Sequence, residues 1–309
     1  MSILENKIKS KQKTVVLPPR FNRLTMYDVI KECVDEDLNP ISDDVIFDLQ
    51  YLTFLEPAGQ TILSNLIEWL GKRGCKRSIT YKKYSSGDPD SYNKRVMQYL
   101  RDISFFAGYL AQEIAEPIGP RKNTCPLVLI NYTESVNWIR HTFMPWMGSV
   151  LGVETSDIDY IQVSLEEIFN NVNDHSDVKT ACISAQFYKK KGQLLICVSD
   201  FGTGISKTLE KKFPFLDEAE RLREATKNGV SSFRNPHNRG FGLGNIIKAI
   251  TAESLGSVHI HSNHGIIDAN SLGIECQRSD TFYPGTFFEF IIDVEQARKM
   301  SNPEEEFAW

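Results

Sequence analysis

The sequence from Gln193 to Gly204 reads QLLICVSDFGTG, and it predicts a buried strand followed by a ligand-binding turn. Residues 194–198 are all apolar, which is typical of a buried strand. Asp200 then places a carboxylate at the carboxyl end of the strand, and the following glycines allow a tight turn. An ionised carboxylate only accepts hydrogen bonds, so Asp200 can receive one from an exocyclic amine. A tight turn with an exposed aspartate is the alternative.

The overlapping stretch GTGISKT, residues 202–208, is similar to a phosphate-binding P-loop but departs from its pattern. That motif requires glycine directly before its lysine, where this chain has Ser206. Phe201 occupies the position of the first glycine of the motif. A P-loop is therefore excluded.

A helix is expected over 157–175, and Glu167, Asn171 and His175 follow one another at i+4 spacing on it. Side chains at this spacing form one ridge on a helix. The ridge lies beside an apolar stripe, so its polar groups can line a cleft whose floor is the core. An ordinary solvated helix shoulder is the alternative. The stripe consists of Ile161, Leu165, Ile168 and Val172.

Two glycine-containing stretches complete the second half. Residues 239–245 read RGFGLGN and lead into a helix expected over 243–251. Glycines at 240, 242 and 244 let backbone N–H groups approach a ligand, and a helix N-terminus attracts anions such as phosphate. Gly285 and Thr286 precede a final strand.

These four motifs, in this order, resemble those of the GHKL ATPase superfamily, which includes gyrase, a heat-shock chaperone, histidine kinases and MutL. The resemblance spans residues 122–296 and implies a Bergerat fold, a two-layer α/β sandwich that binds ATP and Mg²⁺. The matching motifs are Glu167-x-x-x-Asn171, Asp200-x-Gly202-x-Gly204, Gly240-x-Gly242-x-Gly244 and Gly285-Thr286.

The resemblance implies a role for each motif. Asn171 would hold Mg²⁺ together with the phosphates, Asp200 would bind the adenine amino group, and Glu167 would be the general base. Residues 206–239 would form a mobile lid over the nucleotide. The remaining residues implied to bind the cofactor are His175, Gly202 and Gly204, the phosphate-side Gly240, Gly242 and Gly244, and the adenine-side Thr286.

Within the superfamily, His175 completes Glu-x-x-x-Asn-x-x-x-His and resembles the bacterial anti-sigma-factor serine kinases. A sensor histidine kinase should carry a phosphoacceptor histidine before its ATPase domain. His141 is the one histidine upstream of this helix, and it lacks the usual acidic residue directly after it. The resemblance therefore favours a serine kinase or an ATPase.

The first part of the chain alternates short strands and helices, which predicts a small α/β unit with parallel strand pairing. Residues 45–60, VIFDLQYLTFLEPAGQ, resemble the core of a STAS domain. The family carries a phosphorylated serine in the loop that here reads Glu56-Pro57-Ala58-Gly59. Without a hydroxyl, this loop cannot accept a phosphoryl group, and docking or dimerisation is the role left for it. The expected elements are strands at 14–17, 45–49 and 77–81 and helices at 27–34, 58–70 and 92–114.

Length and composition are consistent with two domains. The chain has 309 residues, and the stretch from Pro117 to Pro120 is unsuited to a helix, which places a boundary near residue 120. We expect a STAS-like domain over 1–119, a GHKL domain over 120–300 and an acidic tail over 301–309. The remaining expected elements of the second domain are strands at 127–131, 180–188 and 193–199, helices at 134–150 and 216–227, and three strands ending at Asp293.

Charge and cysteine content narrow the functional classes. The formal net charge is −5, which argues against direct nucleic-acid binding. No run approaches the ~20 apolar residues that span a bilayer, and the first 13 residues lack the apolar region of a signal peptide. The six cysteines are scattered, as expected for reduced thiols in the cytoplasm.

The leading hypothesis is an ATP- and Mg²⁺-binding bacterial signalling protein that hydrolyses ATP or phosphorylates a partner protein on serine or threonine. The expected partner is a STAS-like, sigma-regulatory or other signalling protein. A non-catalytic, ATP-gated interaction module is the alternative, and a homodimer is compatible with both. A metal-dependent enzyme has less support. His259, His261 and His264 have a spacing that could bind a metal, although a strand face followed by a turn explains the same spacing.

Overall fold

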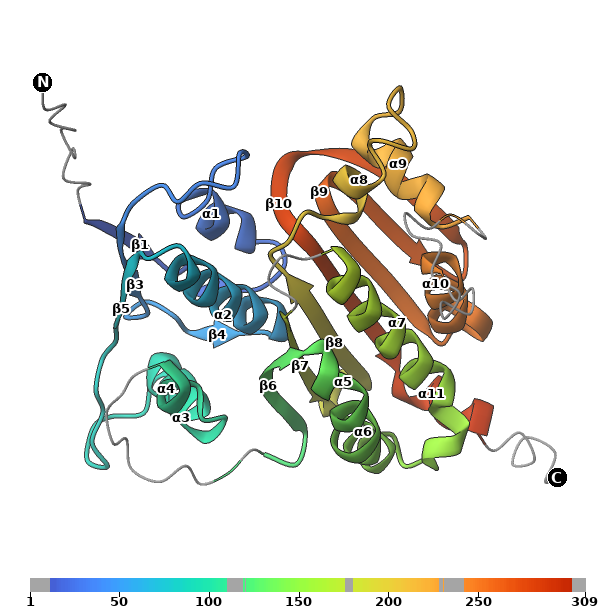
Figure 1. Cartoon of the computed structure of the whole chain (residues 1–309). Helices are drawn as coiled ribbons and strands as arrows, with labels where there is room; N and C mark the ends of the chain where they lie inside the picture. Colours follow the sequence, from blue (N-terminus) through green and yellow to red (C-terminus); the bar gives the residue numbers. More distant parts are fainter. Residues whose placement is uncertain are drawn as a thin grey trace, which may run out of the picture.

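A computed structural model of the chain describes residues 12–109, 119, 121–175, 180–227, 230 and 242–301. These residues form a three-stranded sheet, a five-stranded sheet and a two-stranded pairing, with helices packed around them (Figure 1). The predicted α/β class is confirmed. Of the segment from Pro117 to Pro120 only Gly119 is described, so the expected boundary falls outside the described residues, as does the tail from Asn302.

The N-terminal unit, residues 12–109, confirms the predicted alternation of strands and helices. Its main sheet has the order β1-β3-β5, and both pairings are parallel, as predicted. The two shortest strands, β2 and β4, also pair in parallel. The elements are β1 (Lys13–Val16), β2 (Arg20–Phe21), α1 (Met26–Lys31), β3 (Asp44–Asp48), β4 (Phe54–Leu55), α2 (Pro57–Lys72), β5 (Lys76–Thr80), α3 (Tyr92–Asp102) and α4 (Phe105–Tyr109).

The single helix predicted from Tyr92 to Ile114 is wrong. The chain turns between α3 and α4 at Ser104, whose φ of 59° is left-handed and ends the helix. The turn lets Phe105 and Phe106 enter the core, where each is 3% exposed. Burial of two aromatic side chains outweighs the cost of one strained residue. Residues 110–114 lie outside the described residues.

The five-stranded sheet has the order β6-β7-β8-β10-β9, and all of its neighbours are antiparallel. The strands predicted at 180–188 and 193–199 are present as β7 and β8, which pair with each other as a hairpin. The three strands predicted after residue 251 are wrong, because two long strands occupy that region, and their register shifts between Arg278 and Thr286. The strands are β6 (Thr124–Asn131), β7 (Thr180–Tyr188), β8 (Gln193–Asp200), β9 (Gly256–Asn270) and β10 (Gly273–Asp293).

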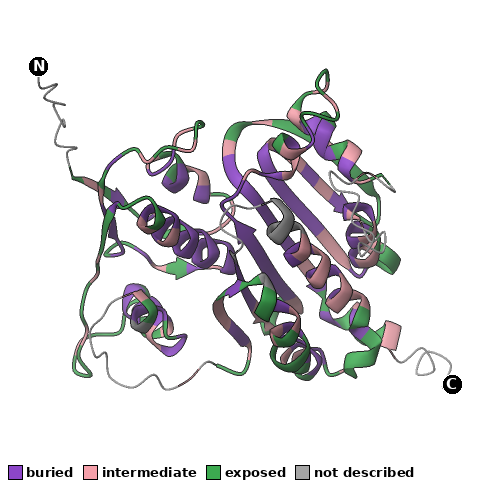
Figure 2. Cartoon of the chain, viewed as in Figure 1, coloured by how far each residue is buried: buried purple, intermediate pink, exposed green. Residues whose placement is uncertain are grey.

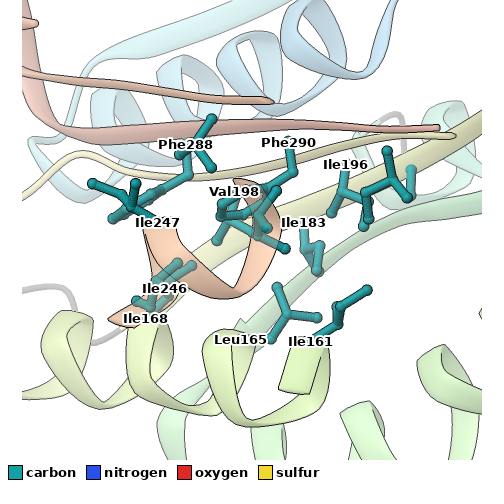
Figure 3. Close-up of a cluster of buried hydrophobic side chains, with 14 of the residues drawn as sticks. Ile161, Leu165, Ile168, Ile183, Ile196, Val198, Ile246, Ile247, Phe288 and Phe290 are labelled. Carbon is teal, nitrogen blue, oxygen red and sulfur yellow. The ribbon is translucent and has the colours of Figure 1, made fainter. Parts of the chain in front are cut away.

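Helices α7 (Asp159–His175) and α10 (Leu243–Thr251) pack on one face of this sheet. The predicted stripe of Ile161, Leu165 and Ile168 is buried there, and Figure 3 shows it facing the side chains of β7, β8 and β10. The remaining helical segments are α5 (Tyr132–Trp138), η1 (Ile139–Phe143), α6 (Met144–Leu151), η2 (Thr155–Ile158), η3 (Lys189–Lys191), α8 (Ile205–Thr208), α9 (Glu218–Ala225), η4 (Ala252–Ser254) and α11 (Val294–Ser301).

The helix predicted over 134–150 continues past Pro145, but it is not a regular α-helix throughout. A five-residue π-helical turn, η1, separates α5 from α6. Pro145 then stands in the first turn of α6, where a missing N–H costs little. The wider turn thus reconciles the proline with a helical path.

Helix α2 covers the opposite face of the five-stranded sheet, so helices flank both faces (Figure 1). Of its 16 residues, 13 are buried, and Figure 2 shows it buried along almost its whole length. A helix buried on nearly every side must lie between two layers, and α2 lies between the small parallel sheet and strands β7 and β8. The N-terminal unit therefore adds a further layer to the one formed by the five-stranded sheet and the helices α7 and α10.

Candidate functional site

Asp200, the last residue of β8, is 6% exposed. Burial raises the pKa of its carboxyl from an ordinary 3.8 to about 7, against the opposing effect of hydrogen bonds from the backbone N–H groups of Gly202 and Thr286. Burial raises this pKa by more than the two hydrogen bonds lower it, so these bonds offset only part of the cost of burying the ionised carboxylate. A ligand that donates a further hydrogen bond would stabilise it.

Asp200 belongs to a row of three buried polar side chains, which we call the polar row. It lies opposite Thr286 on β10, which in turn lies opposite Ser262 on β9. The hydroxyl oxygens of Ser262 and Thr286 are 3.2 Å apart. Val198 and Phe288 lie two residues away on the same strands and face the core under α7 and α10. Because side chains alternate along a strand, Asp200 and Thr286 face that side as well.

The turn after β8 needs its glycines for conformation and space. Gly204 has a φ of 85°, and a Cβ there would lie 2.5 Å from the side-chain oxygen of Asn263. Gly285 has a φ of 91°, and a Cβ there would lie 2.5 Å from the backbone nitrogen of Gly202. Both positions combine a left-handed backbone with close contact, so only glycine fits. The predicted glycine turn is thus present, and Gly285 is a second position at which the close approach of the backbone requires glycine.

Two residues that the sequence did not single out hold this turn against the sheet. The Oγ of Ser262 accepts the first backbone N–H of α8 at 2.7 Å and donates to the carbonyl oxygen of Gly285 at 3.0 Å. The side chain of Asn263 accepts from the Lys207 N–H and donates to the Thr203 carbonyl, both at 3.1 Å. No local motif marks Ser262 or Asn263, because their partners are 23 to 60 residues away in the sequence.

Glu167, Asn171 and His175 all lie on α7, as predicted. Glu167 is half-buried and follows Glu166, whose carboxylate is 2.9 Å from the Arg140 guanidinium. The side chains of Asn171 and His175 lie outside the described part of the structure, so their predicted orientation stays a prediction. The helix that carries all three packs on the same face of the sheet to which the polar row points.

The glycine segment before α10 is partly described. Gly240 lies outside the described residues, and Gly242 is the N-cap of α10. A Cβ on Gly244 would overlap the carbonyl oxygen of Thr226, so glycine is required there by packing. A Cβ on Gly242 would meet no described atom within 4 Å, and its φ of −78° suits any residue. Among the described residues, none crowds this position at the N-terminus of a helix, where an anion could approach.

The segment predicted as a lid, residues 206–239, is helical in much of its described part. The amphipathic helix expected over 216–227 is present as α9, which opens with a capping box between Asp217 and Glu220. Leu222 is fully buried, and α8 and α9 both pack on β9. The predicted amphipathic helix is therefore confirmed. Residues 228, 229 and 231–239 lie outside the described residues, so a lid there stays a prediction.

The histidines of β9 face away from the polar row. His259 Nδ1 is 3.1 Å from the Arg23 guanidinium, and His261 Nδ1 is 2.7 Å from the Tyr27 hydroxyl. Burial lowers the pKa of His261 to about 3, so its imidazole is neutral. Within the described ranges, no group of three His, Cys, Asp or Glu side chains could hold a metal ion. The spacing of His259, His261 and His264 thus reflects contacts between β9 and neighbouring elements, including α1.

Replacing Gly285 by alanine is expected to lower the free energy of unfolding by about 1–3 kcal/mol, because the new Cβ meets backbone atoms at a left-handed φ. The matched control is Gly242→Ala, for which space and φ are permissive, with an expected change within about 0.5 kcal/mol. Chemical denaturation of both variants measures the difference. Equal stability of the two variants would contradict the described geometry of the turn.

The pKa of Asp200 predicts a pH-dependent stability. Its folded-state value of about 7 exceeds the ordinary 3.8, so the folded protein binds this proton more tightly than the unfolded chain does. The contribution of Asp200 to stability therefore falls as pH rises from about 4 through 7. An Asp200→Asn variant should gain stability over the wild type by roughly 2–4 kcal/mol at pH 8 and little at pH 4. A gain that is the same at both pH values would contradict a raised pKa.

Comparison with known proteins found no matching family model, no matching curated protein and no matching solved structure. In the part of the chain that the structure describes, no helix combines the length and the apolar character needed to cross a membrane.

Proposed function

We propose that the protein binds Mg·ATP on the α7/α10 face of the five-stranded sheet, in the manner of the GHKL ATPases, and that the N-terminal unit is STAS-like. The observation that carries the proposal is the polar row. It presents a buried, incompletely compensated carboxylate, Asp200, at the end of a strand, beside a glycine turn and toward the helix that bears Glu167.

The adenine base would bind at the polar row. Its exocyclic amine would donate a hydrogen bond to the Asp200 carboxylate. This bond would offset part of the cost of burying the carboxylate in its ionised form. Thr286 would line this end of the site, since it lies directly opposite Asp200. The raised pKa of Asp200 fits this role, because binding energy is largest where a buried acceptor would otherwise be unsatisfied.

The phosphates would extend toward the N-terminus of α10, where no described atom would crowd a Cβ on Gly242. Asn171 would hold Mg²⁺ together with the phosphates; a neutral amide oxygen suits an ion that keeps most of its ligands from phosphate and water. When bound, Mg²⁺ supplies neutralisation of the charge on the phosphates. Glu167 would accept the proton of the attacking hydroxyl or water.

The phosphoryl acceptor would belong to a partner protein or be water. The loop of the N-terminal unit cannot serve, because Pro57 and Ala58 carry no hydroxyl and are buried in the first turn of α2. The purified protein should therefore be incubated with Mg·ATP, with and without cell lysate, and followed by mass spectrometry. New phosphoserine or phosphothreonine on a lysate protein indicates a kinase, whereas ADP alone indicates an ATPase.

The control for this experiment is Asn171→Ala, which should fold normally but lose Mg²⁺-dependent ATP binding and every product. If neither ADP nor phosphosites form although ATP binds, the non-catalytic interaction module replaces the enzyme. Absence of ATP binding by the wild type would contradict the proposed function itself.

A further inference from the structure

Helix α2 of the N-terminal unit contacts the back of the strand end that carries Asp200. Ser199 and Phe201 flank Asp200 and, by strand alternation, point to the opposite face of the sheet. There the side-chain amide of Asn65 donates a hydrogen bond to the Ser199 hydroxyl. The rings of Trp69 and Phe201 meet edge to face, with centroids 6.5 Å apart. All four of these contacting side chains are buried, at most 6% exposed.

The contact with Ser199 is one of three buried polar contacts that seat α2 on the sheet. Ser184 on β7 donates to the Gln60 side chain at 3.0 Å, and the Cys182 thiol donates to the Ser64 hydroxyl at 3.2 Å. Any shift of α2 along the strands would leave several of these buried groups unpaired, which is costly. The three contacts therefore define one position of α2 relative to β7 and β8.

The contact extends to the strand that carries Thr286. The ring of Tyr283 meets that of Phe201 edge to face, with centroids 5.7 Å apart, and packs at a tilt against that of Phe287, with centroids 5.8 Å apart. Phe201 follows Asp200 directly, and Phe287 follows Thr286 directly. Both strand ends of the polar row are thus held from behind by one buried aromatic cluster, which packs against Trp69.

We propose that the N-terminal unit controls the nucleotide site through α2, with Asn65 and Trp69 as positioning residues for Asp200. This inference rests on the proposed nucleotide site. Because Ser199 and Phe201, which contact α2, are the direct neighbours of Asp200 in the chain, a displaced α2 would move the Asp200 carboxylate. Such coupling is reciprocal: the factor by which docking of α2 raises the affinity for ATP is also the factor by which bound ATP favours docking of α2. A partner protein that displaces α2 from the sheet would therefore lower the affinity for the nucleotide.

The test compares two alanine variants of α2 by calorimetric titration with ATP in the presence of Mg²⁺. Asn65→Ala should weaken ATP binding about 5- to 150-fold, the range of typical coupling between sites. Gln60→Ala is the matched control, because it removes a similar buried contact of the same helix, at Ser184, away from the Asp200 turn. It should bind ATP within about 2-fold of the wild type.

A double variant, Asn65→Ala with Ser199→Ala, should be no weaker than either single variant, since one contact is lost in all three. Equal affinities in the wild type, Asn65→Ala and Gln60→Ala would overturn the inference while leaving the proposed function intact. Failure of the wild type to bind ATP would overturn both.

Hydrogen exchange of the wild-type protein provides a second measurement that needs no variant. ATP should slow exchange of the backbone amides of α2 as well as those at the end of β8. If ATP protects residues 198–204 but leaves residues 57–72 unchanged, the two units are not coupled and the inference is wrong.

Discussion

The Asp200→Asn variant is expected to reverse the base preference of the protein, from ATP to inosine triphosphate. The adenine C6 amine donates a hydrogen bond to the wild-type carboxylate, whereas the C6 carbonyl of inosine can only accept. At pH 8 the wild-type carboxylate, with a pKa of about 7, is mostly ionised and also only accepts. Asparagine would turn its N–H donor toward the base, because its carbonyl oxygen is needed to accept from the backbone N–H groups of Gly202 and Thr286. Each mismatched combination should bind about 10- to 100-fold more weakly than the matched one.

Titration of both proteins with both nucleotides at pH 8 gives four affinities and a direct test of the reversal. Asp293→Asn is the control, because Asp293 is an exposed residue at the far end of β10 and should leave all affinities unchanged. If Asp200→Asn weakens the binding of both nucleotides equally, Asp200 has a structural role and does not distinguish the two bases.

The Glu167→Gln variant is expected to bind ATP with nearly wild-type affinity but to lose turnover by about 10²- to 10⁴-fold, the usual contribution of a general base. Glutamine keeps the shape of the side chain and removes its ability to accept a proton. Separate measurement of ATP affinity and of ADP release distinguishes loss of the base from loss of the site.

The matched control is Glu166→Gln, on the next residue of the same helix. Its carboxylate already pairs with Arg140 at 2.9 Å, so its removal should leave turnover within about 3-fold of the wild type. A Glu167→Gln enzyme that turns over at the wild-type rate would place the base elsewhere.

Local patterns predicted the elements that hold the site. The apolar run before Asp200 predicted β8, and the helix expected over 243–251 is α10 with the same bounds. The glycine turn followed from Gly202 and Gly204 because backbone freedom is a property of single residues. These features need no partner from elsewhere in the chain, which is why the sequence reveals them.

The features that escaped prediction depend on distant partners. Gln60 and Asn65 look like the solvated side of α2, and only the five-stranded sheet packed against them explains their burial. Ser262 binds the start of α8, 57 residues away, and no periodicity signals such a pair. The end of helix α3 before Ser104 likewise depends on the position of the core in which Phe105 and Phe106 are buried. Tertiary packing decides these positions, and local propensity does not.

A calorimetric titration of the wild-type protein and Asp200→Ala with ATP, in the presence of Mg²⁺ at pH 8, tests the central claim most directly. We expect the wild type to bind one ATP per chain and the variant to show no saturable binding at the same concentrations. Equal binding by the two proteins, or no binding by the wild type, would contradict the assignment of the nucleotide site to the polar row.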